Sequence, residues 1–156
     1  MTAINCDDPE HRETVVNSDH LFFDAAEAPN GKSDLLDGNK TQDALILLLE
    51  YLIAGGWHFE ITSVNTDHPN DAALGAHCHN PCGFAVDGWP LTGPTPGAWL
   101  DAGDPYFQAF LTYMAGCPSL HQIGLAGTAQ TAANTTAAGP TVFDDAGADH
   151  IHFGAQ

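Results

Sequence analysis

The sequence predicts an α+β fold in one globular domain. The first observation is the order of the predicted elements, which is helix, strand, strand, helix, strand, strand. The second is the length of 156 residues, of which 44% are hydrophobic, enough to build one core. The third is that no apolar run reaches about 18 residues, so no transmembrane helix is expected.

Residues 1–40 are rich in carboxylates and show little hydrophobic periodicity. We expect them to form an acidic N-terminal arm that wraps the domain or docks on a neighbour. Within this arm, Val15-Val16 and Leu21-Phe22-Phe23 could form short extended pieces. The domain itself is expected to cover residues 41–156.

The clearest predicted helix covers residues 41–54. Thr41 is a candidate N-cap, the following residues are apolar almost all round, and the Gly55-Gly56 pair predicts the end of the helix. Residues 57–64 alternate in the pattern typical of a strand. A buried helix followed by a strand is therefore expected at the start of the domain.

The second half of the chain alternates short apolar segments with long polar connections. Asp104-Pro105 predicts a helix start, because aspartate is a favoured N-cap and proline fits the first turn. The remaining predicted segments are a loop at 65–83, a buried strand at 84–86 ending at Asp87, a connector at 88–103, a strand at 122–125, a surface loop at 126–141 and a last strand at 150–153.

The charge balance excludes two classes of partner. Twenty Asp and Glu residues face three Lys and Arg residues, which gives a formal net charge of -17. Nucleic acids and anionic membranes are bound through clustered cationic side chains, which this chain lacks. The overall charge suits solubility or adaptation to salt, and we expect attraction of metal cations only where carboxylates meet histidines.

Two segments concentrate metal-binding side chains. The first contains Asp67, His68, His77, Cys78, His79 and Asp87, and the second contains Asp144, Asp145, Asp149, His150 and His152. Metal sites such as those of zinc need nitrogen and carboxylate donors that converge from different segments. A catalytic site adds a carboxylate that acts as general base.

Local geometry refines this picture for the last strand. Side chains alternate along a strand, so His150 and His152 are expected on one face, while Asp149 stands where the strand begins. Cys78 and Cys82, four residues apart, could join a zinc cluster, but no second Cys pair completes one. A disulfide or simple burial is at least as plausible for these two cysteines.

Residues 79–87 resemble a signature of the D-Ala-D-Ala carboxypeptidase family, Ser-x-His-x-x-Gly-x-Ala-x-Asp, and residues 149–152 resemble its second signature, Asp/Glu-x-x-His. The family includes phage L-alanyl-D-glutamate endopeptidases and shares its fold with the Hedgehog signalling domain. The resemblance covers roughly residues 41–154. It implies a small antiparallel sheet flanked by helices, a zinc ion held by His79, Asp87 and His152, and Asp149 as the base.

The sequence departs from the family pattern at three places. The step from His79 to the next glycine is one residue longer, and His77 replaces the signature serine, so His77 is an alternative ligand. His77, His150 and Asn65 are otherwise expected as outer contacts of the ligands or as alternative ligands. Where the family tends to carry an arginine, this chain has Asn65, so oxyanion stabilisation would depend on metal, histidine or backbone.

Two functions follow as hypotheses. The first is a phage-encoded zinc peptidase that hydrolyses peptide bonds of peptidoglycan. The second is a non-catalytic virion or tail component, or a metal-stabilised binding module, whose partners would be other phage structural proteins. Residues 1–10 lack the layout of a signal peptide, so the expected location is the virion, or the host cell wall after release.

Overall fold

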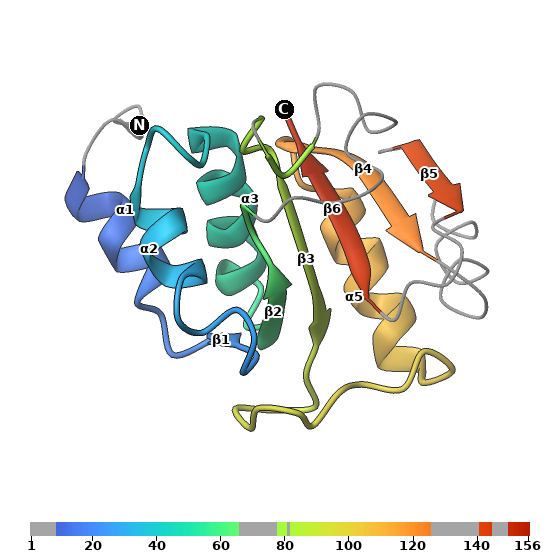
Figure 1. Cartoon of the computed structure of the whole chain (residues 1–156). Helices are drawn as coiled ribbons and strands as arrows, with labels where there is room; N and C mark the ends of the chain where they lie inside the picture. Colours follow the sequence, from blue (N-terminus) through green and yellow to red (C-terminus); the bar gives the residue numbers. More distant parts are fainter. Residues whose placement is uncertain (1–8, 66–77, 81, 126–140, 145–149) are drawn as a thin grey trace.

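The computed structural model describes residues 9–65, 78–80, 82–125, 141–144 and 150–156. These residues form four helices and a six-stranded sheet (Figure 1), which confirms the α+β class. In chain order the elements are α1 (Pro9–Val16), β1 (Leu21–Phe23), α2 (Gly31–Leu36), α3 (Asp43–Ala54), β2 (Phe59–Ser63), β3 (Ala85–Pro90), α5 (Pro105–Ala115), β4 (Leu120–Leu125), β5 (Thr141–Asp144) and β6 (Ile151–Ala155).

The strand order in the sheet is β1-β2-β3-β6-β4-β5. The three central pairings are antiparallel, whereas β1 with β2 and β4 with β5 are parallel. The sheet is therefore mixed, and the expectation of an antiparallel sheet was wrong at both edges. At the first edge the reason is the connection, because α2 and α3 carry the chain back and allow β2 to run parallel to β1.

Helix α3 confirms the predicted buried helix, but its start differs from the prediction. The helix begins at Asp43, and the N-cap position is held by Gln42, whose side chain makes no capping hydrogen bond. Thr41 is not the cap: its hydroxyl donates to the carbonyl oxygen of Asp34 and so ties the end of α2 to the start of α3. The end of α3 at Gly55 agrees with the prediction.

Helix α5 confirms the predicted start at Asp104-Pro105. The carboxylate of Asp104 accepts a hydrogen bond from the backbone N–H of Tyr106 at 2.8 Å. The ring of Phe110 on this helix packs against Phe59 of β2 and Phe153 of β6, with ring centroids 6.0 Å apart in both pairs. In Figure 1, α5 lies behind β6, and Phe110 and Phe153 belong to the same buried core cluster as the apolar side chains of α3.

The N-terminal segment takes part in this core through Val15, Val16, Leu21 and Leu35. Val15 and Val16 end a helix rather than form an extended piece, while residues 21–23 form β1 as predicted. The buried guanidinium of Arg12 donates to the carbonyl oxygens of Leu35 and Thr41 and binds the carboxylate of Asp43. One side chain thus joins α1 to α2 and to α3.

The second half of the chain contains longer strands than predicted. The strand expected to end at Asp87 continues to Pro90, and β4 and β6 each extend beyond their predicted ranges. The short strand β5 was not predicted and begins at the last residue of the loop expected at 126–141, of which residues 126–140 lie outside the described residues. No helix in the described ranges is long and apolar enough to cross a membrane.

Candidate metal centre

Strands β3 and β6 place two of the predicted ligands side by side. Asp87 and His152 are directly opposed in the antiparallel ladder, and Val86 and Phe153 form the next pair. Because side chains alternate along a strand, Val86 and Phe153 enter the core while Asp87 and His152 lie on the other face. On each strand, one residue thus packs in the core while its neighbour in sequence contributes a candidate ligand.

His79 reaches the same face from the loop that precedes β3. The backbone N–H of Gly83 donates to the carbonyl oxygen of His79 at 2.8 Å, which closes a turn around the histidine. Gly83 has a φ of 70°, and a Cβ there would lie 2.2 Å from the carbonyl oxygen of Lys40. The glycine therefore lets the turn dock against the start of α3, where the N–H of Gln42 donates to the Gly83 carbonyl oxygen.

The three side chains bring their ligand atoms into a nearly equilateral triangle. His79 Nε2 lies 3.1 Å from Asp87 Oδ1 and 3.2 Å from His152 Nδ1, and the third edge, from His152 Nδ1 to Asp87 Oδ1, is 3.1 Å. In a tetrahedral zinc site with ligand distances of about 2.0 Å, neighbouring ligand atoms lie about 3.3 Å apart. This group could hold a metal ion.

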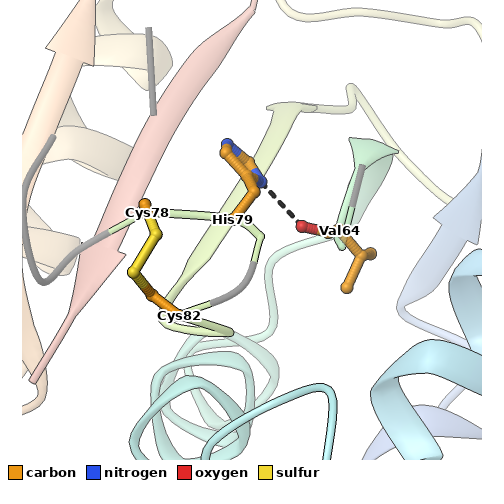
Figure 2. The surroundings of a disulfide bond; sticks show 4 residues. All are labelled: Val64, Cys78, His79 and Cys82. Carbon is orange, nitrogen blue, oxygen red and sulfur yellow. Dashed lines mark hydrogen bonds between the residues drawn. A yellow bond between two sulfur atoms is a disulfide. The ribbon is translucent and has the colours of Figure 1, made fainter. Parts of the chain in front are cut away.

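The other nitrogen of His79 is held by the backbone. His79 Nδ1 lies 2.7 Å from the carbonyl oxygen of Val64 and must donate to it (Figure 2). A neutral His79 then directs the lone pair of Nε2 towards Asp87 Oδ1, which also carries lone pairs. Only a proton on Nε2 or a cation between the atoms relieves this repulsion, and orientation of a histidine by a backbone carbonyl is typical of metal sites.

A further histidine completes the polar cluster. His150 Nε2 lies 3.2 Å from Asp87 Oδ2, the carboxylate oxygen that is not part of the triangle. His150 and His152 therefore share one face, as the strand pattern predicted. The side chains of His79, Asp87 and His152 are 0%, 2% and 3% exposed, whereas that of His150 is 16% exposed and borders solvent.

Burial alone would raise the pKa of the Asp87 carboxyl group. The hydrogen bonds from His152 and His79, together with the charges of His79 and His150, act in the opposite direction and hold that pKa well below its usual range. Asp87 is therefore a carboxylate in the folded protein. An anion in this position attracts a proton or a metal cation to the neighbouring imidazoles.

The other predicted site residues are placed as follows. Asn65 is partly buried and lines a polar cleft of about 810 Å³ together with Ser63, Asn80 and Lys40, close to the triangle but outside it. Ser63 is the backbone partner of Asp87 in the β2–β3 ladder. His77 and Asp149, the alternative ligand and the predicted base, lie outside the described residues.

Two features of the site were not fixed by sequence reasoning. Cys78 and Cys82 form a disulfide (Figure 2), which the sequence left open beside burial and metal binding. Their positions on either side of the candidate ligand His79 were the feature of the sequence that could have favoured a disulfide. The role of the Val64 carbonyl carried no signal, because a backbone acceptor has no signature in the sequence.

Comparisons of the chain with protein-family models, with curated proteins and with solved structures found no match.

Proposed function

We propose that this chain is a zinc-dependent, peptidase-like domain that hydrolyses peptide bonds of peptidoglycan, with a fold of the D-Ala-D-Ala carboxypeptidase and Hedgehog type and a phage origin. The observation that carries the proposal is the convergence of His79, Asp87 and His152. They come from a loop and two strands and place three ligand atoms 3.1–3.2 Å apart.

The donor set favours zinc over the hard cations. Two imidazole nitrogens and one carboxylate oxygen match the three-ligand sets of catalytic zinc sites, whereas magnesium and calcium prefer oxygen ligands alone. Zinc supplies Lewis-acid activation of water and of a peptide carbonyl. The chain supplies the orientation of the ligands, through the contact of His79 with Val64 and that of His150 with Asp87.

The polar cleft beside the triangle is suited to a peptide. Asn65 and Asn80 contribute amide groups that can pair with a peptide backbone, and Lys40 contributes a cation that is bound to Asp34 at 2.6 Å. The resemblance assigns Asp149 the task of accepting the proton of the attacking water. In this proposal the cleft holds the substrate and the triangle lies beside the scissile bond.

The test is hydrolysis of purified peptidoglycan by the zinc-loaded protein, followed by mass spectrometry of the released peptides. Asp149→Asn is expected to keep zinc and fold but to lose about 10²–10⁴ in kcat. His121→Gln, which changes an exposed histidine on β4, is the matched control and is expected to keep full activity. Absence of products from a folded, zinc-loaded parent protein would falsify the peptidase proposal.

A second candidate is a metal-stabilised binding module, and the burial of the triangle favours it. Structural zinc sites are closed, whereas catalytic sites keep one position open for water or substrate. Cobalt substitution separates the two, because a small hydroxamate changes the visible spectrum of cobalt only when it can reach an open position. An unchanged spectrum in the presence of the hydroxamate would favour the binding module.

A further inference from the structure

The three candidate ligands are held by different means. Asp87 and His152 lie opposite each other in the β3–β6 ladder, so backbone hydrogen bonds on both strands fix their separation. His79 lies in a loop and reaches them only if this loop keeps its position. The geometry of the loop therefore decides whether the triangle closes.

The disulfide between Cys78 and Cys82 closes a ring of the chain around His79. The two Cα atoms lie 5.3 Å apart, and the turn inside the ring points the imidazole towards Val64 (Figure 2). The sulfur bridge joins Cys78, which precedes the histidine directly, to Cys82, which precedes the docked Gly83. Because Gly83 is docked against the start of α3, the covalent link also restrains Cys78 and, with it, the position of His79.

Hydrogen bonds support the same turn but do not replace the bridge. The N–H of Phe84 donates to the carbonyl oxygen of Cys78 at 3.1 Å, and the N–H of Gly83 donates to that of His79. Both bonds connect the turn to the residues just before β3. A single backbone hydrogen bond adds little net stability, so these two bonds limit the movement of His79 less strictly than a covalent bond.

We propose that the Cys78–Cys82 disulfide positions His79 for metal binding, and that its reduction lowers the metal affinity of the site. Two equivalents of a thiol reductant would break the sulfur–sulfur bond, leave two cysteine thiols and become one disulfide themselves. The turn would then relax, and His79 Nε2 would leave the triangle for part of the time. This inference rests on the metal site of the proposed function but not on its hydrolytic activity.

Zinc affinity of the oxidised and the reduced protein tests this inference, measured by competition with a chromophoric chelator. Cys6, which lies outside the described residues, is replaced by serine in every protein. Reduction with a phosphine, which takes its oxygen from water to become the phosphine oxide and leaves the same two cysteine thiols, is expected to lower the affinity about 10- to 100-fold, the range typical of lost supporting contacts around metal ligands. The double variant Cys78→Ser/Cys82→Ser is expected to show the low affinity with and without phosphine, which also controls for binding of zinc by the phosphine.

Cys117→Ala provides the matched control, because this buried cysteine is free and belongs to the core cluster. It is expected to respond to the phosphine as the parent protein does. Circular dichroism of each metal-free protein checks that the fold is kept. Equal affinity before and after reduction would overturn the inference, and so would a higher affinity after reduction, because the freed thiolates would then be ligands themselves.

The outcome for the disulfide is distinguishable from the outcome for the peptidase. A zinc affinity that depends on the disulfide, in a protein that hydrolyses nothing, supports the inference and contradicts the enzyme. Hydrolysis by a protein whose zinc affinity does not change on reduction supports the enzyme and contradicts the inference. A parent protein that binds no zinc in either state overturns both.

Discussion

The two faces of the β3–β6 pair bury different kinds of side chain, apolar on one face and polar on the other. On one face, Val86 and Phe153 are buried among the aromatic rings of the core. On the other, Asp87 and His152 are equally buried but polar. The ladder that aligns the first pair also aligns the second, because a shift of one residue would exchange the faces.

The difference between the faces lies in what each one needs. Apolar side chains gain free energy from any close packing, so the core face tolerates changes of partner if volume is kept. A buried carboxylate needs directed partners, and Asp87 finds them in His152 within the pair and in His79 and His150 outside it. The site face is therefore complete only when the loop before β3 is in place.

The largest expected effect lies on the core face. Phe153→Ala removes a fully buried ring that packs against Phe59 and Phe110, and should lower the free energy of unfolding by about 3–5 kcal/mol. Urea unfolding with and without zinc measures this loss. The loss should be the same in both conditions, and a loss that appears only with zinc would show that the two faces are not separable.

The next effect lies on the site face. Asp87→Ala removes the carboxylate shared by three histidines, and should lower zinc affinity by more than about 100-fold, beyond the usual cost of an outer contact. The rise in Tm on adding zinc should disappear with it, because binding stabilises only the folded state. Unchanged zinc content by elemental analysis would remove Asp87 from the ligand set.

A smaller effect is expected from His150, which contacts Asp87 from outside the triangle. His150→Gln should lower zinc affinity about tenfold without abolishing it, as is typical of contacts that orient a ligand. Calorimetric titration with zinc distinguishes the two roles. If the loss equalled that of Asp87→Ala, His150 would be a ligand and the triangle would have to be redrawn.

The parts of this arrangement that follow local rules could be predicted from the sequence. The cap at Asp104 and the buried helix before Gly55 follow from residue types that favour one backbone conformation. The common face of His150 and His152 follows from alternation alone. The convergence of His79, Asp87 and His152 was implied by the resemblance of residues 79–87 and 149–152 to two family signatures, because no local rule connects residues so distant in sequence.

The parts that were missed depend on contacts between distant segments. Thr41 was expected to cap α3, but its hydroxyl has a partner in the carbonyl oxygen of Asp34. Val15 and Val16 have the residue types of a strand, yet burial against the core and the contacts of Arg12 stabilise a helix there. Tertiary packing outweighed propensity at both places.

The last prediction concerns pH and applies to the metal-free protein. The pKa of Asp87 is lower in the folded chain than in the unfolded chain, where it should be about 3.9. The unfolded chain therefore binds this proton first as the pH falls, and the stability contributed by the carboxylate is present above about pH 4 and is lost below it. Urea unfolding in the presence of a chelator, from pH 6 down to pH 2.5, should show a steeper decline in the free energy of unfolding for the parent than for Asp87→Asn.

Phe153→Ala should lower the whole curve without changing this slope, since the core face carries no titrating group. Parallel curves for the parent and Asp87→Asn would mean that the histidines do not hold the carboxylate as an anion, and the electrostatic account of the site face would be wrong.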